Sequence, residues 1–293
     1  MKILITGVSG LLGNELAKLL CEDKTNSVYG LSRSAAKLNF PNYTHITVDL
    51  NTNGFTDSLP KDINAIIHLA QSEKFRDFPA SAEEIFNVNT LSTLKLLDFG
   101  RTIGIKRFIY ASSGGVYGNK DVGFTEESPI MGNGDLGFYL SSKLCAEILA
   151  DNYSEFFHVV QLRFFFMYGE LQNKGMLIPR LLNSVVNKIP ITLAGENGIV
   201  INPVYIGDAA QAVCKALLID HSDKINVAGT ENISLKQIAT TIGSKVKIDP
   251  IFEHSKNEAK NLIGDITKMK KMLHVPQTTF EKGIEKLIDH GKK

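Results

Sequence analysis

Short apolar runs alternate with longer amphipathic stretches through the first two-thirds of the chain. The runs expected to form strands are Lys2–Thr6, Ser27–Leu31, Thr44–Val48, Ala65–Leu69, Arg107–Ala111 and His158–Phe164. Helical spacing marks segments between them, including Leu12–Leu20, Ala82–Gly104 and Leu140–Tyr153. Continuously apolar strands separated by helices are typical of a parallel sheet that is covered on both faces. The pattern therefore predicts an α/β fold with a doubly wound parallel sheet, which binds ligands at the carboxyl ends of its strands.

The alternation weakens after residue 170. Prolines interrupt shorter elements there, at Pro179, Pro190, Pro203, Pro250 and Pro276. We expect a smaller C-terminal lobe formed by about residues 170–202 and 222–293. The segment Asp208–Asp220 has helical spacing and is expected to return to the main sheet. The larger domain would then comprise residues 1–169 together with about 203–221.

Composition describes an ordinary soluble protein. The 293 residues are 43% hydrophobic and 22% charged, with a net charge of +1, so no nucleic-acid partner and no basic membrane-binding face are expected. No apolar run approaches the about 18 residues of a membrane span, and a strand this close to the start leaves no room for a signal peptide. Cys21, Cys145 and Cys214 lie in helical stretches without CxxC spacing, which predicts buried, reduced thiols and a cytoplasmic location.

Two classes of hydrolase lack their motifs. The seven histidines show no HExxH or other metal spacing, and no G-x-S-x-G sequence is present. Neither a metal site nor a serine nucleophile is expected.

A glycine-rich turn follows the first predicted strand, in the sequence GVSGLLG. Gly7 would make the turn, Gly10 would allow a phosphate to approach, and Gly13 would let the following helix pack on the strand. Asn14 stands where a nucleoside-triphosphate loop has Lys followed by Ser or Thr. The turn therefore favours a dinucleotide pyrophosphate, with a ligand-free glycine turn as the alternative.

The end of the second strand bears on the choice of dinucleotide. An acidic residue there binds the adenosine ribose, whereas an arginine accepts a 2′-phosphate. The sequence has Ser32 and Arg33 and no carboxylate, which favours NADP over NAD. Alternatively, Arg33 stacks on the adenine or points into solvent.

A tyrosine and a lysine are spaced for acid–base chemistry. Tyr139 and Lys143 are four residues apart on a predicted helix and so share one face. A nearby ammonium is expected to lower the pKa of Tyr139 and make it a usable acid and base. Ser113 follows the strand Arg107–Ala111 and would bond a substrate oxygen opposite Tyr139. Y-x-x-x-K alone is common by chance, and its position after this strand is what gives it weight.

At this point the chain resembles the extended short-chain dehydrogenase/reductases, the NAD-dependent epimerase/dehydratase family. The resemblance covers nearly the whole chain and rests on an ordered series of motifs: GVSGLLG, Asp49-Leu50, IIHLAQ, NVNTLSTLKLLDFG, YASSGGVYG, Tyr139-x-x-x-Lys143, LRFFFMYG, NPVYIGDAA and INVAGTENISLKQIA. It implies a Rossmann-type domain that holds NAD(P) and a small C-terminal lobe that holds substrate.

The resemblance also implies roles for individual residues. Tyr139 would be the acid and base, Lys143 would hold the nicotinamide ribose, and Ser113 would polarise the reacting C–O group. Cofactor contacts are implied for Gly7, Gly10, Leu11, Leu12, Gly13, Ser32, Arg33, Asp49, Leu50, Leu69, Ala70, Gln71, Asn89, Ala111, Ser112, Tyr139, Lys143 and Phe166. Substrate contacts are implied for Ser113, Gly114, Tyr139, Phe166, Lys174 and Arg180. Within these sets Asp49 and Leu50 would meet the adenine, and Asn89 occupies a position where the family often has a structural Asn.

The sequence departs from the family at three places. Nucleotide-sugar 4,6-dehydratases carry an Asp-Glu pair after the catalytic hydroxyl, whereas this chain has Gly114 and Gly115, so dehydration is disfavoured. Phe166 replaces an Asn near the sugar diphosphate, and Ile201 replaces an Arg. Lys174 or Arg180 would have to substitute, unless the alignment slips by one residue there. The run of phenylalanines at 164–166 either lines an apolar pocket or belongs to the core.

The leading hypothesis is a nucleotide-sugar C4 epimerase that works by hydride transfer at a carbinol or keto carbon. An NADPH-dependent keto-reductase is the first alternative, favoured by Arg33 and by the missing diphosphate contacts. A non-enzymatic dinucleotide sensor is the second, although such proteins usually lose the tyrosine. A homodimer is implied by the resemblance, through a four-helix bundle that includes the Tyr–Lys helix. Leu144, Ile148 and Leu149 would supply apolar surface there, although core packing explains them equally well.

Overall fold

The computed structural model describes residues 1–36, 38–118, 123–131 and 136–291. Within them, seven parallel strands form the main sheet, in the order β11 (Asp223–Val227), β6 (His158–Phe164), β5 (Arg107–Ser113), β4 (Ala65–His68), β1 (Lys2–Thr6), β2 (Ser27–Ser32) and β3 (Tyr43–Thr47). The strand order reverses between β1 and β4, which is where such sheets bind ligands. The predicted doubly wound parallel sheet is confirmed.

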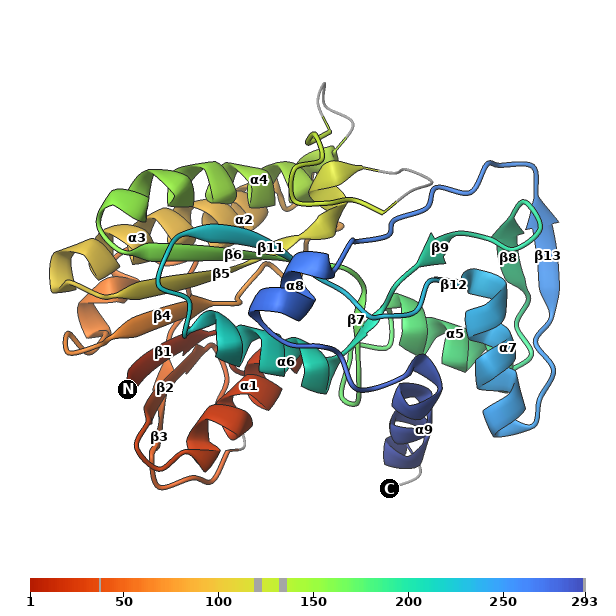
Figure 1. The fold of residues 1–293 in the computed structure, drawn as a ribbon, viewed down its shortest axis with the longest axis horizontal. Coiled ribbons are helices and arrows are strands. Elements are labelled where there is room, and N and C mark those ends of the chain that lie inside the picture. Colours follow the sequence, from red (N-terminus) through yellow and green to blue (C-terminus); the bar gives the residue numbers. More distant parts are fainter. Residues whose placement is uncertain (37, 119–122, 132–135, 292–293) are drawn as a thin grey trace.

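Helices cover both faces of this sheet (Figure 1). On one face lie α1 (Leu11–Glu22) and α6 (Ile206–Ala216), which pack against each other. On the other lie α2 (Ala82–Phe86), α3 (Ser92–Ile103) and α4 (Gly137–Asn152), with a π-helical turn at Asn87–Leu91. Helix α1 buries an apolar stripe that includes Leu12, Leu16 and Leu20. The sheet thus separates two hydrophobic cores, and both strand faces are covered.

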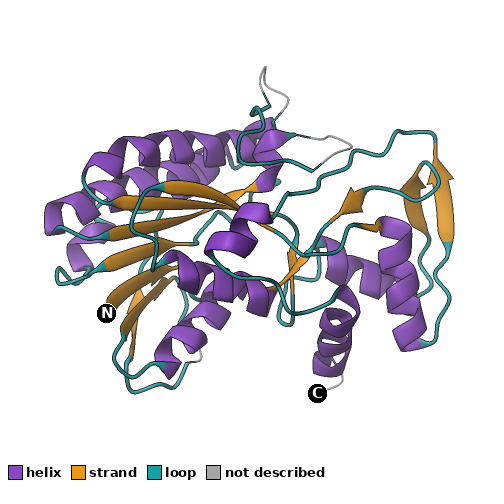
Figure 2. Cartoon of the chain, viewed as in Figure 1, coloured by secondary structure: helices purple, strands orange, loops and turns teal. Residues whose placement is uncertain are grey.

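The second lobe lies beside the carboxyl ends of the strands and contains small sheets and short helices (Figure 2). Its strand pairs are β7 (Met167–Tyr168) with β10 (Val204–Tyr205), β9 (Val200–Ile201) with β12 (Ile233–Ser234), and β8 (Ile191–Ala194) with β13 (Phe252–Ser255). Its helices are α5 (Leu177–Val186), α7 (Leu235–Val246) and α9 (Phe280–Gly291), while α8 (Thr267–Met272) lies against the main sheet. Ser234 caps α7 together with Gln237, a pairing that satisfies the first N–H groups of a helix.

The predicted domain boundary at residue 222 is wrong. Residues 223–227 form β11, which pairs in parallel with β6 from Asp223–Val160 to Val227–Phe164. Helix α8 also packs against β11. Only Ile225 and Val227 of this strand are apolar, and they are separated by Asn226, so the segment shows a weak strand pattern. The main sheet therefore takes a strand from the segment that was expected to belong wholly to the lobe.

The cysteines differ partly from expectation. Cys21 is buried and Cys214 is half-buried, but Cys145 is exposed on the outer face of α4. Its helical position did not reveal which face of α4 it occupies. Among the described helices, none has both the length and the apolar character that crossing a membrane requires.

Candidate active site

The glycine turn between β1 and α1 is tightly enclosed. Gly7 has φ +72°, and a Cβ there would lie 2.9 Å from Ala70 Cα. A Cβ on Gly13 would lie 2.2 Å from the carbonyl oxygen of Gly7. Gly10 precedes the first turn of α1, which has no side-chain cap, so N–H groups at this helix end are available to an anion. This cradle fits the pyrophosphate of a dinucleotide.

A buried chain of hydroxyls and an imidazole ties the cradle to the next strand. Thr6 and His68 are partners in the β1–β4 register, and Thr6 Oγ1 lies 2.7 Å from His68 Nδ1. Thr6 Oγ1 also accepts from the backbone N–H groups of Leu69 and Ala70, at 3.2 and 3.1 Å. Its own O–H must therefore donate to His68 Nδ1. Burial lowers the pKa of His68 to about 3, so the imidazole is neutral.

The series of buried hydrogen bonds continues from Nε2 of the His68 imidazole. His68 Nε2 lies 3.0 Å from Thr93 Oγ1, which donates to the carbonyl oxygen of Asn89 at 2.8 Å. The Asn89 side chain accepts from Ser72 N at 2.8 Å and donates to Ser142 Oγ at 2.9 Å. Both ends of the Asn89 amide are thus bonded to protein groups. This arrangement supports the structural role suggested for Asn89 in the family, and the direct cofactor contact stays a prediction.

Tyr139 lies in the first turn of α4, beneath the loop that follows β4. Its hydroxyl donates to Gln71 Oε1 at 2.9 Å, and its ring lies 5.1 Å from the ring of Phe75. Burial raises the pKa of Tyr139. The expected lowering of this pKa by Lys143 is not seen in this structure, where desolvation of the phenolate is the cause of the shift.

Lys143 is buried one turn further along α4, with 2% of its surface exposed. Its Nζ donates to Ala111 O at 3.0 Å, the one acceptor bonded by Nζ in the described part of the chain. Burial lowers the pKa of Lys143 to about 7, against an opposing effect of Glu147. An ammonium has three N–H donors, so Lys143 is suited to hold ribose hydroxyls.

The end of β5 supplies two serines. Ser113 Oγ accepts from Gly115 N at 3.2 Å, which leaves its O–H to donate to a substrate oxygen. Ser112 Oγ is buried and has no hydrogen-bond partner among the described residues. A buried polar atom without a partner is costly, so Ser112 also fits a site that a polar ligand completes.

The space beside Gly114 is already filled. A Cβ at Gly114 would lie 2.4 Å from the ring of Phe165. A Cβ at Gly115 would lie 2.9 Å from Leu140. An Asp-Glu pair of the dehydratase type would therefore clash with Phe165 and Leu140 as they are packed here.

The remaining predicted residues divide between surface and core. Arg33 forms an ion pair with Glu73, at 2.9 Å between Nη2 and Oε2. Ser32 Oγ donates to Ser34 O, and Asp49 Oδ1 accepts from Asn51 N. Leu11 at the start of α1 and Leu69 after β4 are partly buried, whereas Leu12, Leu50 and Ala111 are buried. The buried side chains of Leu12 and Leu50 belong to the hydrophobic cores.

The predicted substrate residues after β6 are not brought together by any contact that the structure shows. Of the three phenylalanines that were expected either to line a pocket or to belong to the core, Phe164 and Phe165 are core residues. Phe166 is half-buried and has a φ of +43°. Ile201 is fully buried. Lys174 and Arg180, before and within α5, are exposed.

Sequence reasoning missed several residues that shape the site. Thr6, His68 and Thr93 form the buried series of hydrogen bonds. Glu73 forms the ion pair with Arg33. The motif IIHLAQ contained one signal, because a histidine that ends an apolar strand must find partners when it is buried.

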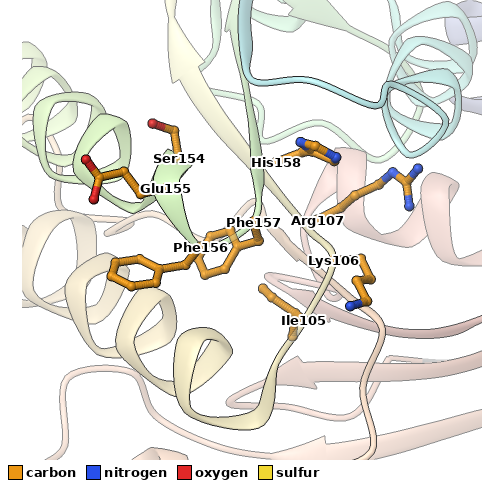
Figure 3. Close-up of a pocket in the computed structure, with 8 residues that line it drawn as sticks. All are labelled: Ile105, Lys106, Arg107, Ser154, Glu155, Phe156, Phe157 and His158. Carbon is orange, nitrogen blue, oxygen red and sulfur yellow. The ribbon is translucent and has the colours of Figure 1, made fainter.

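A separate hollow lies at the opposite edge of the sheet, where β5 and β6 begin (Figure 3). It has a volume of about 370 Å³ and is lined by residues 105–107 and 154–158. None of the predicted site residues lines it. The candidate site described above lies instead at the carboxyl ends of the strands.

The fold and site define a class. A glycine cradle at the switch point of a doubly wound sheet, with a buried lysine and a tyrosine one turn apart beside it, is the architecture of a dinucleotide-dependent enzyme. A family model described as the NAD dependent epimerase/dehydratase family matches residues 3–228. The chain belongs to this family, which confirms the resemblance seen in its motifs.

Relatives in other organisms match this chain over nearly its whole length. An uncharacterised UDP-glucose epimerase, YtcB of Bacillus subtilis, is 28% identical over 97% of this chain and 96% of its own length. A UDP-glucuronate 4-epimerase of Thermodesulfobacterium geofontis is 26% identical over 99% and 96%. The crystal structure of UDP-glucuronic acid 4-epimerase from Bacillus cereus, in complex with UDP-glucuronic acid and NAD, is 25% identical. It superimposes with a TM-score of 0.89 over 100% of this chain and 99% of that one.

Proposed function

We propose that this protein is an NAD(P)-dependent C4 epimerase of a nucleotide-linked hexose or hexuronate. The observation that carries the proposal is the placement of Tyr139 and Lys143 beside the end of β5, next to the glycine cradle. The packing of Phe165 against Gly114 supports epimerisation over dehydration. The full-length similarity to 4-epimerases supports the same reaction.

The residues act on protons and on orientation. Bound NAD(P) supplies a hydride acceptor and donor at its nicotinamide ring. Tyr139 takes the proton of the sugar hydroxyl during oxidation and returns it during reduction of the opposite face. Ser113 donates to the reacting oxygen, and Lys143 holds the ribose. Lys174 and Arg180 remain the proposed cations for the sugar diphosphate.

We infer that the dinucleotide is NAD. The sequence favoured NADP because Arg33 follows β2, but the guanidinium is paired with Glu73. A carboxylate at this place also repels a 2′-phosphate. The NAD present in the Bacillus cereus complex supports this choice. Keto-reduction with NADPH remains the second candidate, supported by the position of Arg33.

Two measurements test the proposal. The purified protein is denatured and any released nucleotide is identified by mass, and UDP-glucose and UDP-glucuronate are separately incubated with the enzyme and followed by ¹H NMR. We expect bound NAD and appearance of the C4 epimer without net cofactor consumption. The Tyr139→Phe variant should bind NAD and form no epimer. Stoichiometric oxidation of NADPH by a keto-sugar, with no epimer formed, would instead establish a reductase.

A further inference from the structure

Gln71 is the one described side chain whose hydrogen bond to the Tyr139 hydroxyl the structure shows. The phenol donates to Gln71 Oε1 at 2.9 Å. Gln71 lies three residues after the end of β4, and it is 68 residues away from Tyr139 in the sequence. The sequence motif had suggested that Gln71 contacts the cofactor. Its observed partner is instead the atom that exchanges protons in the proposed reaction.

The backbone on both sides of Gln71 is fixed. Ala70 N donates to Thr6 Oγ1 at 3.1 Å, and Ser72 N donates to Asn89 Oδ1 at 2.8 Å. Both acceptors are fully buried. The position of Gln71 is therefore set by buried hydrogen bonds, although its side chain is exposed.

The same Asn89 also fixes Tyr139. Its amide donates to Ser142 Oγ at 2.9 Å, and Ser142 Oγ donates to Tyr139 O at 2.7 Å. One buried amide thus holds the loop that carries Gln71 and the helix turn that carries Tyr139. The distance between Gln71 and Tyr139 is thereby built into the fold.

A side-chain amide can serve both protonation states of a phenol. Its oxygen accepts from a phenol O–H, and after rotation of the terminal torsion its N–H₂ donates to a phenolate. Burial raises the pKa of Tyr139, so the phenolate needs donors if Tyr139 is to act as a base. Bonds to a charged acceptor are about twice as strong as neutral ones.

We propose that Gln71 is a positioning residue for proton exchange at Tyr139, accepting from the phenol and donating to the phenolate. The inference rests on the role of Tyr139 in the proposed function. In the oxidation half, the sugar hydroxyl loses its proton to Tyr139 Oη and the amide turns its oxygen toward the new phenol. In the reduction half, the proton returns to the substrate oxygen and Nε2 donates to the phenolate. The amide itself gains and loses no proton.

Other titratable groups surround Tyr139. Lys143 lies one turn further along α4. Tyr110 on β5 interacts electrostatically with Tyr139. On the loop side, the Arg76 guanidinium packs over the ring of Phe75, 4.9 Å from its centroid. These groups are unchanged by substitutions at Gln71, so each variant reports the effect of the amide against a constant background.

The test uses NAD-loaded protein labelled with ¹³C at the tyrosine Cζ, with the Tyr139 signal assigned by its loss in Tyr139→Phe. Gln71→Glu keeps an acceptor, lacks the donor and adds negative charge, whereas Gln71→Met keeps only the length. We expect the pKa of Tyr139 to rise by about one unit or more in Gln71→Glu and by less in Gln71→Met. The acidic limb of the kcat/KM profile should move to higher pH by the same amounts.

Cofactor affinity separates this role from the one suggested by the motif. Both variants should bind NAD as the unaltered protein does, while kcat at neutral pH falls about tenfold or more. An unchanged pKa of Tyr139 in both variants would overturn the inference, as would weakened NAD binding with kcat intact. The NMR titration needs no substrate. A shifted pKa without epimerisation of any sugar would uphold the inference and reject the proposed function.

Discussion

The Arg33 guanidinium at the end of β2 is paired with the Glu73 carboxylate from the loop after β4, at 2.9 Å. Both side chains are largely exposed, so the pair itself stabilises the fold little. The position of the pair matters for the proposed choice of cofactor, because in sheets of this kind an arginine after the second strand accepts an adenosine 2′-phosphate. The guanidinium that would otherwise favour NADP is thus already paired with Glu73.

Replacing Glu73 by Gln should therefore improve NADP binding. We expect the ratio of NADP to NAD affinity to rise about fivefold, equivalent to about 1 kcal/mol, since one exposed ion pair is removed. Isothermal titration with both dinucleotides measures this ratio. Glu83→Gln makes the same charge change on α2 without touching Arg33, and it should leave the ratio unaltered. If both variants behave alike, Arg33 does not approach the 2′ position.

The lowered pKa of Lys143 should make the stability of the protein depend on pH. Its pKa is about 7 in the folded protein and 10.5 ordinarily, so between these values the unfolded chain binds more protons. The free energy of unfolding should then rise with pH, by up to about 1.4 kcal/mol per unit from this group, and the burial penalty is fully present below pH 7.

Lys143→Met removes the titration and keeps the apolar stem. In nucleotide-free buffer the variant should be more stable than the unaltered protein at pH 6, and the difference should shrink toward pH 9. Urea unfolding at several pH values measures it, and other titrating groups cancel because both proteins share them. Parallel pH curves for the two proteins would mean that the folded pKa of Lys143 is not lowered.

The sequence predicted the sheet because each strand is a local apolar run, and it predicted the glycine cradle because that motif is also local. Strand β11 was not predicted because only Ile225 and Val227 in it are apolar, and Asp223, Lys224 and Asn226 are polar. The buried Thr6–His68 contact arises from the register of two strands that are 62 residues apart. No periodicity in either strand reveals such a register.

The same limit applies to electrostatics. The motif placed Arg33 correctly after β2, but its partner Glu73 comes from a loop beyond another strand of the sheet. Likewise, spacing placed Tyr139 and Lys143 on one helix face, yet how deeply a group is buried depends on what packs over it. The shifts in pKa at both residues follow from that burial and not from their spacing.

A buried ion pair anchors the helix that carries Tyr139 and Lys143. Arg163 of β6 donates from Nε and Nη2 to the two carboxylate oxygens of Glu147 of α4, at 3.0 and 2.6 Å, and each side chain is at most 4% exposed. Glu147→Gln should cost about 3–5 kcal/mol of unfolding free energy, because it leaves a buried charge without its partner.

Replacing both members tests the origin of that cost. The Glu147→Leu/Arg163→Met double variant should be less destabilised than the sum of its single variants, because it leaves neither charge behind. Urea unfolding of the four proteins gives the coupling energy. Simple additivity would show that the two side chains act independently, despite their contact.

The outer face of α4 bears on assembly. Ile148 is 55% exposed there, one turn from the exposed Cys145. If the predicted homodimer uses this helix, Ile148→Asp should shift the protein toward monomer, because it introduces a charge into an apolar contact. Sedimentation velocity measures the mass. Leu218→Asp, at a 67% exposed position after α6, is the matched control and should not change it. A monomeric unaltered protein would refute the predicted dimer outright.

Phe166 stores backbone strain at the end of β6. Its φ of +43° is in the left-handed region, which costs a residue with a Cβ about 1–2 kcal/mol relative to glycine. Its carbonyl oxygen accepts from Val204 N at 3.2 Å, a bond that helps to hold this conformation. Phe166→Gly and Phe166→Ala both lose the aromatic ring, so the difference between them isolates the strain.

We expect Phe166→Gly to be more stable than Phe166→Ala by about 1 kcal/mol, the reverse of the usual order. Thr192 provides the control, because it is exposed in strand β8, where glycine should be the less stable replacement by about 0.5–1 kcal/mol. Urea unfolding of the four variants decides the matter. If alanine is favoured at both positions, Phe166 is not strained, and the left-handed turn after β6 places no demand on the residue that occupies it.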